Sequence, residues 1–231
     1  MKMADESEQL IGLQVKFILW LSLFAIIVFA LLFVPAGTLR FWQAWVYFVI
    51  FLTATITLTV YLLKNNPQLL RRRLRRREKI KEQKRIQMVN TLLSIIGFML
   101  PGIDHRFGLS HVPINIVLLA DVMIVLGYLL IFRVFQENIY ASSIIEVEKD
   151  QQVVTTGLYS IIRHPMYFGA IIMLLFVPLA LGSYWALIPF LLMDGLIIVR
   201  LLNEEQYLLK DLPGYREYMQ HTPYRLVPYV W

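Results

Sequence analysis

Residues 113–135 read PINIVLLADVMIVLGYLLIFRVF, a run of 23 residues in which Asp121 and Arg133 are the only charged side chains. As an α-helix this run would extend ~35 Å, enough to cross the ~30 Å hydrocarbon core of a bilayer. A buried helix of a soluble protein rarely has so long an apolar run. The stretch therefore predicts a membrane-spanning helix, and it sets the fold class.

The composition of the whole chain is also that of a membrane protein. Of its 231 residues, 58% are hydrophobic and 16% are charged, and the mean hydropathy is +0.61. In soluble domains, about a quarter of the residues are charged. We therefore predict an all-α, polytopic transmembrane helical bundle that forms a single integral-membrane domain over residues 1–231.

Five further apolar runs flank this one, and we expect a span in each, at residues 13–34, 41–63, 88–103, 166–181 and 184–202. The run 88–103 is short and contains Gly97 and Pro101, which predicts a helix that is tilted, broken or partly re-entrant. The first run has no small-residue cleavage site behind it, so we expect it to stay as a helix. After residue 202, a charged segment broken by Pro213 and Gly214 predicts short interfacial helices.

Positive charge is concentrated in one loop. Eleven of the 22 Lys and Arg residues lie between Lys64 and Arg85, and residues 71–77 read RRRLRRR. A basic block can bind nucleic acid, but this one lies between two apolar runs and has no interleaved aromatic residues. We interpret it as a loop that faces anionic lipid headgroups, with no nucleic-acid partner. With six spans, only Arg40 and Arg106 fall on the far side. The positive-inside rule then places both termini in the cytosol, at a bacterial inner membrane or an endoplasmic reticulum.

Several kinds of site are excluded by the residues that the chain lacks. It has no cysteine, which excludes disulfides, thiolate metal sites and a cysteine nucleophile. Its four histidines have no metal-ligand spacing, so we expect no metal site. A Gly-x-Gly-x-x-Gly turn after a strand is also missing, which excludes a soluble-type dinucleotide or methyltransferase fold. A nucleotide-derived cofactor would have to be held by helix ends and loops.

Residues 157–167, GLYSIIRHPMY, form a polar, turn-rich segment between apolar runs. A turn at Gly157 would leave backbone groups free to bond an adenine or ribose edge, although an ordinary linker over 151–159 is the alternative. Pro165 fits the first turn of a helix, whose free N–H groups favour an anion such as a carboxylate. Arg163 would add positive charge there. Alternatively, Arg163 and His164 only anchor the helix at the headgroup level.

Arg200 and Glu204 stand one helical turn apart at the end of the last apolar run, so they share a helix face. If that face borders a cavity, the planar guanidinium of Arg200 suits bidentate binding of a carboxylate. The alternative is an ion pair of Arg200 with Glu204 or Glu205 that contributes only a few tenths of a kcal/mol. Weaker candidates, which would pair with one another or line a cavity, are Asp121, Arg133 and Asp194.

Taken together, these motifs resemble the isoprenylcysteine carboxyl methyltransferase family and the wider group that includes phospholipid methyltransferases. The resemblance covers about residues 137–231, and Glu137-Asn138-x3-Ser142 resembles the loop of prokaryotic members. The ordered motifs are Gly157-x-Tyr159-x3-Arg163-His164-Pro165-x-Tyr167, Arg200-x3-Glu204-Glu205, Gly214-Tyr215-x2-Tyr218 and Tyr224-Arg225-Leu226-x-Pro228.

The resemblance implies S-adenosylmethionine as the methyl donor, bound between the polar loop and the last helices. It implies Arg200 as a catalytic, substrate-facing residue and Glu204 as a catalytic, cofactor-facing acid. Gln151-Gln152 departs from the eukaryotic pattern, which tends to have His ahead of the two hydrophobic residues. The implied cofactor residues are Gln151, Gln152, Val153, Val154, Gly157, Tyr159, Arg163, His164, Pro165, Met166, Tyr167 and Glu204.

We therefore expect methyl transfer from S-adenosylmethionine to a lipophilic acceptor at the cytosolic membrane face, in the first place carboxyl O-methylation of an isoprenylcysteine-like substrate. A phospholipid N-methyltransferase stays an alternative. An NADPH-dependent sterol-type reductase would need more positive charge for the 2′-phosphate, and only Lys149 lies nearby in the loop. A non-enzymatic lipid-binding protein or a transporter is the remaining alternative, but the chain shows no internal repeats.

Overall fold

The computed structural model describes the backbone of residues 2–74, 81–141, 144, 147 and 151–231, and within these ranges the side chains from residue 11 on, except residue 74. In this part of the chain every regular element is helical. The order is α1 (Lys2–Ala36), α2 (Trp42–Asn65), α3 (Pro67–Leu74), α4 (Lys81–Phe107), α5 (Ile114–Glu137), the 3-10 turn η1 (Gly157–Ser160), α6 (Pro165–Ala180), α7 (Leu187–Asp211) and α8 (Tyr215–His221).

Six of these helices lie where the six apolar runs predicted spans. Four of them, α1, α2, α4 and α5, are long and apolar enough to cross a membrane. α6 is a shorter apolar helix of 16 residues, and α7 has 25 residues but contains Asp194 and Arg200. The predicted class, a helical multi-pass integral membrane protein, is confirmed.

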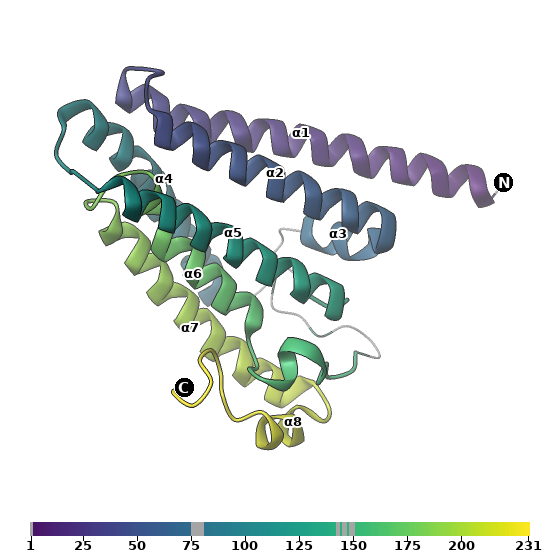
Figure 1. Cartoon of the computed structure of the whole chain (residues 1–231). Helices are drawn as coiled ribbons and strands as arrows, with labels where there is room; N and C mark the ends of the chain where they lie inside the picture. Colours follow the sequence, from purple (N-terminus) through teal and green to yellow (C-terminus); the bar gives the residue numbers. More distant parts are fainter. Residues whose placement is uncertain (1, 75–80, 142–143, 145–146, 148–150) are drawn as a thin grey trace.

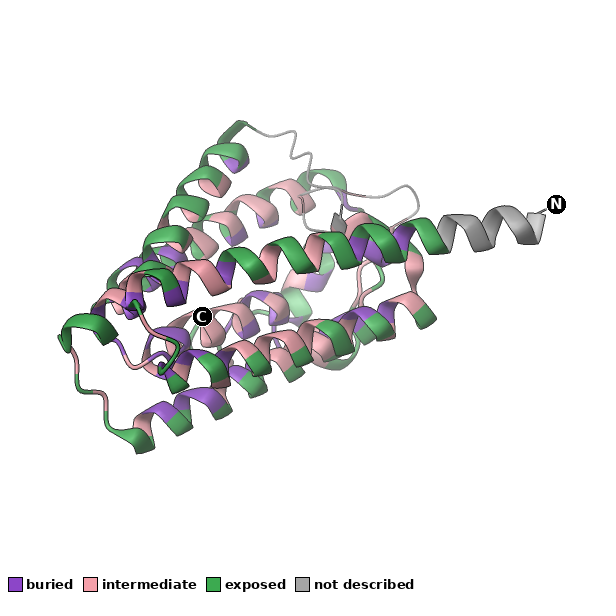
Figure 2. Ribbon diagram, turned by 90° about the horizontal axis from the view of Figure 1, so that it is seen from above, coloured by how far each residue is buried: buried purple, intermediate pink, exposed green. Residues whose placement is uncertain are grey.

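The outer surface of the bundle is apolar. Exposed residues cover the outward faces of the long helices (Figure 2), and they include Leu19 and Ile26 on α1, which are 66% and 65% exposed, and Leu119 on α5, which is 56% exposed. In water such a large apolar surface would favour aggregation, whereas in lipid it is the expected surface. The exposure pattern thus fits helices that contact the bilayer directly.

The helices alternate in direction, so that α3, the C-terminal end of α5 and α8 gather at the same end of the bundle as the N-terminus (Figure 1). Two glycines fix the position of α6 at this end relative to α5. A Cβ on Gly127 would lie 3.0 Å from the carbonyl oxygen of Gly169, and one on Gly169 would lie 3.1 Å from that of Gly127. Small residues let membrane helices approach each other closely, so α5 and α6 pack backbone against backbone.

Two predictions about helix ends are wrong. α4 is a continuous helix of 27 residues that passes through Pro101, so the broken alternative is wrong, while the tilted and re-entrant alternatives stay predictions. The predicted span began at residue 88 and so left out the polar first turns of α4, residues 81–87. These residues are good helix formers. Residues 203–211 continue α7 rather than forming a separate interfacial helix, because no helix breaker precedes Pro213. Beyond Gly214, which has a φ of +83°, α8 is the short helix that was predicted.

The basic block 71–77 is only partly described. Residues 75–77 lie outside the described residues, and residues 71–73 are on α3. Arg71 is exposed, as expected for a residue that faces lipid headgroups. Arg72 and Arg73 are half-buried, and Nη1 of Arg72 donates to the carbonyl of Ile139 at 3.1 Å. Part of the block therefore packs against the protein instead of forming a solvated loop.

Candidate functional site

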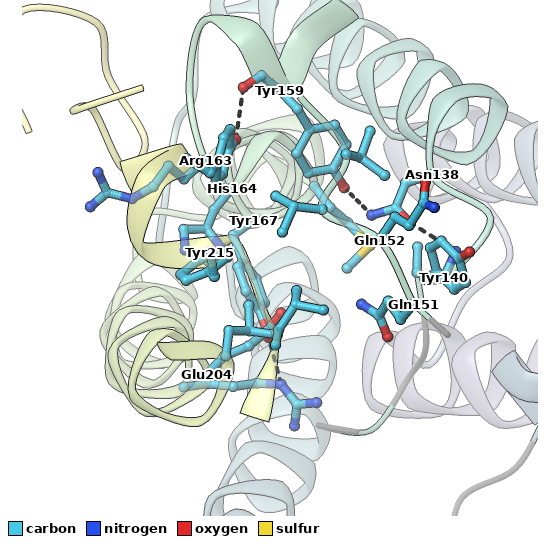
Figure 3. A pocket seen from close by; sticks show the side chains of 18 of the residues that line it. Asn138, Tyr140, Gln151, Gln152, Tyr159, Arg163, His164, Tyr167, Glu204 and Tyr215 are labelled. Atoms are coloured by element: carbon cyan, nitrogen blue, oxygen red, sulfur yellow. Dashed lines mark hydrogen bonds between the residues drawn. The ribbon is translucent and has the colours of Figure 1, made fainter. Parts of the chain in front are cut away.

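A polar cavity lies at this end of the bundle, between the segment that follows α5, residues 151–154, and the helices α6, α7 and α8 (Figure 3). The space between its walls, including the open mouth, is ≈ 860 Å³. The predicted residues that line it are Gln151, Gln152, Val153, Val154, Tyr159, Arg163, His164, Met166, Tyr167, Arg200 and Glu204.

Two predicted residues, Gly157 and Pro165, do not line the cavity but shape the backbone around it. Pro165 is buried in the first turn of α6. Gly157 has a φ of +58°, and a Cβ there would lie 2.3 Å from the carboxylate of Glu137. That carboxylate accepts a hydrogen bond of 2.8 Å from the backbone N–H of Leu158. Glycine thus permits both the turn and its attachment to the end of α5.

We expect Gly157→Ala to destabilise this turn by ~1–2 kcal/mol through its left-handed backbone, and by more because Glu137 must move away. The variant should lose affinity for the ligand of the cavity and melt at a lower temperature in detergent. Gly195→Ala is the matched control, because a Cβ at that helical position would have no atom within 4 Å. Equal behaviour of the two variants would contradict the assigned role of Gly157.

Other lining residues were given no role from the sequence. They are Asn138, Tyr140, Ala141, Ile144, Leu208, Leu212, Tyr215 and Tyr218. Asn138 donates to the hydroxyl of Tyr159 at 2.8 Å, and the hydroxyl of Tyr218 donates to the Tyr159 carbonyl at 2.7 Å. Three of these residues, Asn138, Tyr215 and Tyr218, lie in the quoted motifs, so the motifs could have identified them as site residues. The apolar residues carried no signal.

A buried charge cluster centred on Glu205 lies behind the cavity. Nε of Arg163 donates to Oε1 of Glu205 at 2.7 Å, Nε of Arg225 donates to Oε2 at 2.8 Å, and Nε2 of His164 lies 3.3 Å from Oε1. Burial alone would raise the pKa of Glu205, but hydrogen bonds from His164, Arg225 and Arg163 outweigh it and lower the pKa to about 2. Glu205 is therefore charged at neutral pH and joins the start of α6 to the C-terminal segment.

Arg163 is further bound by the backbone of the C-terminal segment. Its Nη1 donates to the carbonyls of Thr222 and Pro223 at 2.9 and 2.7 Å, and its own N–H donates to the Tyr224 carbonyl at 2.9 Å. Arg163 and His164 are 5% and 6% exposed. The alternative in which they anchor the helix among lipid headgroups is therefore wrong, because they are buried in protein. These contacts mainly position the cavity wall.

A second polar cluster lies on the cavity wall itself. The hydroxyl of Tyr167 on α6 donates a short hydrogen bond to the carboxylate of Glu204, and it accepts one of 3.1 Å from Nε of Arg200 (Figure 3). Nη1 of Arg200 lies 3.5 Å from Oε1 of Gln83, a residue of α4 that is 1% exposed. Gln83 was not recognised as a candidate, because it falls in the polar segment that was interpreted as a loop.

Arg200 also lines a second cavity, which is apolar and runs between α4, α5, α6 and α7. The volume of this cavity, including its open part, is ≈ 680 Å³. Of the described residues, Arg200 is the one that lines both cavities. The other residues of the apolar cavity are Ile86, Gln87, Asn90, Ile131, Ala170, Met173, Leu174, Met193, Leu196 and Ile197. The Arg200 guanidinium thus stands where a polar and an apolar compartment meet.

The three weaker candidates lie away from the polar cavity. Asp121 and Asp194 are buried in α5 and α7, and within the described structure both Asp121 carboxylate oxygens and one of Asp194 have no hydrogen-bond partner. Arg133 is exposed and donates to Gln136 at 3.2 Å. These three residues therefore do not pair with one another as expected, and none of them lines the polar cavity.

Comparisons with known proteins bear on the same part of the chain. Residues 115–213 match the family described as phospholipid methyltransferase. This segment runs from α5 to the end of α7 and contains Tyr167, Arg200 and Glu204. The mouse delta(14)-sterol reductase TM7SF2 is 33% identical over 84 residues, which is 35% of this chain and 20% of the reductase. The chain thus matches about a fifth of the length of that relative. The first match agrees with the wider methyltransferase group that the motifs resemble.

Proposed function

We propose that this protein transfers a methyl group from S-adenosylmethionine to a lipophilic acceptor at the cytosolic face of its membrane. The observation that carries the proposal is the position of Arg200, which borders a polar cavity on one side and an apolar cavity on the other. A polar methyl donor and a lipophilic acceptor can meet where a polar cavity and an apolar cavity join. The phospholipid methyltransferase match over residues 115–213 supports methyl transfer as the reaction.

The lining of the polar cavity fits S-adenosylmethionine. It offers a carboxylate at Glu204, side-chain amides at Gln151 and Gln152, and the aromatic ring of Tyr159, which suit the ammonium, ribose and adenine groups of that molecule. The hydroxyl of Tyr215 is buried and has no hydrogen-bond partner among the described residues. Buried polar atoms are nearly always satisfied, so a bound ligand is a suitable partner for it. When bound, the cofactor supplies a methyl group activated by its sulfonium.

The task of the protein is then to align two molecules and exclude water. Arg200, held by Tyr167 and Gln83, would fix an anionic oxygen of the acceptor with its planar fork of donors. An ionised carboxylate oxygen would form its bond to the methyl group as the methyl–sulfur bond breaks and S-adenosylhomocysteine leaves. No proton has to be removed, so the protein would need only to align the two molecules and exclude water. These features favour carboxyl O-methylation of an isoprenylcysteine-like acceptor, whose tail would occupy the apolar cavity.

The similarity to a sterol reductase calls for a direct comparison with NADPH. The 2′-phosphate of NADPH needs a nearby cation. Among the described lining residues, the arginines of the polar cavity are Arg163 and Arg200, and Arg163 is already bound to Glu205 and to two carbonyls. Lys149, the loop cation seen in the sequence, lies outside the described residues. The match to the phospholipid methyltransferase family over residues 115–213 therefore supports a methyl donor rather than NADPH.

Two measurements on the purified protein test the proposal. Calorimetric titration should show saturable binding of S-adenosylmethionine and not of NADPH. Radiolabelled methyl donor should then label one of a panel of acceptors, comprising N-acetyl-S-farnesylcysteine, phosphatidylethanolamine and a sterol. Binding of NADPH alone would establish a reductase instead. Binding of neither molecule would leave a lipid-binding protein as the function.

We expect Glu204→Gln to weaken S-adenosylmethionine binding ~10-fold or more, because the amide keeps the shape and a hydrogen-bond acceptor for Tyr167 but removes the negative charge. Glu217→Gln on α8 is the matched control, since Glu217 is exposed and does not line the cavity. Calorimetric dissociation constants of both variants provide the measurement. An unchanged constant for Glu204→Gln would refute the role of Glu204.

A further inference from the structure

Residues 224–231, the C-terminal hook, form a turn that is closed by its own backbone. The N–H groups of residues 225–227 all donate to the carbonyl oxygen of Trp231, at 2.8, 3.0 and 3.2 Å. Tyr229 has a φ of +63°, in the left-handed region that bulky residues seldom adopt. Such a conformation persists where the surrounding structure enforces it, and it is a reason to look for a function.

The hook is attached to the wall of the polar cavity. The carbonyl of Tyr224 accepts a hydrogen bond of 2.9 Å from the backbone N–H of Arg163. The carbonyl of Arg225 accepts one of 3.0 Å from the N–H of His164, which lines the cavity. Nε of Arg225 also donates to the buried carboxylate of Glu205 at 2.8 Å. The position of the hook is therefore fixed relative to the start of α6.

The packing of Leu226 places the hook at the depth where α6 enters the apolar part of the bundle. Leu226 is buried against Leu201 of α7, and Phe168 and Ile171 of α6 pack on the same cluster. Both α6 residues lie within the first two turns of that apolar helix. Leu202, next to Leu201 on α7, is exposed and belongs to the outer apolar surface. The hook thus lies beside the lipid-facing side of α7 (Figure 1).

The tip of the hook is apolar and points away from the protein. Tyr229 is 88% exposed and Val230 is 77% exposed, more than any of the span residues quoted above, and Val227 and Trp231 are exposed as well. Tyr and Trp are enriched at membrane–water interfaces, where the ring enters the apolar layer and the polar atom stays hydrated. We propose that the hook inserts Tyr229 and Val230 into the bilayer at the boundary between headgroups and acyl chains.

The backbone of the hook is suited to a region that is poor in water. A loop can enter such a region only if its N–H groups have partners. Besides the three bonds to Trp231, the N–H groups of Val230 and Trp231 donate to the carbonyl of Val227 at 3.2 and 3.1 Å, and Pro228 has no N–H group. Together with the adjoining lipid-facing surface of α7, this internal bonding favours lipid as the partner of the tip.

The test measures how deep the tip lies in a bilayer. The chain has no cysteine, so Val230→Cys creates one attachment site for a nitroxide label in nanodiscs of phosphatidylcholine and phosphatidylglycerol. Collision with oxygen, which concentrates in lipid, is compared with collision with a water-soluble nickel chelate. Glu217→Cys on α8 is the matched exposed control, and Leu119→Cys is the control on a span. We expect the label at residue 230 at a depth of ~5–10 Å, between the two controls.

A second substitution tests the role of the Tyr229 ring. Asn tolerates the left-handed backbone, so Tyr229→Asn keeps the turn and removes the ring. Combined with Val230→Cys, it should move the label toward water, and an unchanged depth would contradict anchoring by Tyr229.

Two results would overturn the proposal as a whole. If the label at residue 230 reacts with the nickel chelate as readily as the label at residue 217, the tip lies in water. If it is shielded from both reagents, a protein partner or a second copy of the chain covers the tip instead of lipid. Val227→Cys gives the same measurement from another exposed position if the Val230 variant does not fold. Neither cofactor nor acceptor is present, so the result is independent of the proposed function.

Discussion

Arg200→Ala is expected to reduce methyl transfer by ~10²–10³-fold while the affinity for S-adenosylmethionine stays nearly unchanged. A preorganised charge at the reacting group contributes about this much to many enzymes. Arg200 lines both cavities, so its loss should disturb the acceptor, whereas the Tyr167–Glu204 hydrogen bond on the cofactor side stays in place. Transfer of radiolabel to N-acetyl-S-farnesylcysteine and calorimetric titration of the methyl donor measure the two quantities separately.

Arg133→Ala is the matched control for this prediction. Arg133 is an exposed arginine near the same end of the bundle, and its side chain donates to Gln136. Its removal should change neither quantity. A loss of cofactor affinity in Arg200→Ala as large as its loss of turnover would show that Arg200 serves the donor rather than the acceptor.

Glu205→Gln is expected to destabilise the protein by about 3–5 kcal/mol, the usual effect of removing one partner of a buried ion pair. The side chains of Arg163 and Glu205 are 3% and 5% exposed, so the guanidinium would stay buried without its counter-ion. The start of α6 and the C-terminal segment should separate. Limited trypsin digestion after Arg225 and thermal unfolding in detergent would report the change, with Glu217→Gln as the exposed control.

The same pair predicts how stability depends on pH. The pKa of Glu205 is lowered to about 2 in the folded protein, below its ordinary value. Its stabilising contribution is therefore complete above the ordinary carboxyl pKa and is lost as the pH falls toward 2. Wild type should lose this increment on acidification, and Glu205→Gln should lack it. Parallel melting curves of the two proteins between neutral pH and pH 3 would contradict the assignment.

The fold class was predictable because the bilayer leaves few solutions. A segment such as 113–135 must satisfy its backbone internally, so a long apolar run implies a helix. The helix ends were less predictable. Residues 81–87 are polar yet helical, and an apolar pattern does not detect them. Residues 203–211 were predicted to be helical, but the end of the apolar run hid that they continue α7.

The candidate site was predictable where local spacing was sufficient. Arg200 and Glu204 share a face by helical periodicity, and both line the polar cavity. Partners that come from distant segments were not predictable. Gln83 reaches Arg200 across 117 positions of the chain, and Arg73 reaches Met166 across 93. Glu205 looked like a surface neighbour of Arg200, but its partners come from the start of α6 and the C-terminal segment.

The close approach of Gly127 and Gly169 divides the bundle into a stiff side and a compliant one. At that point the backbones of α5 and α6 approach each other closely, and the side chain of Met173 packs against Gly127, so the two helices cannot move apart without losing close packing. If the apolar cavity widens to admit a bulkier acceptor tail, α4 and α7 on its other side are then the helices that move. Tail-length preference should accordingly be adjustable by changing residues of α4, while the cofactor side keeps its shape.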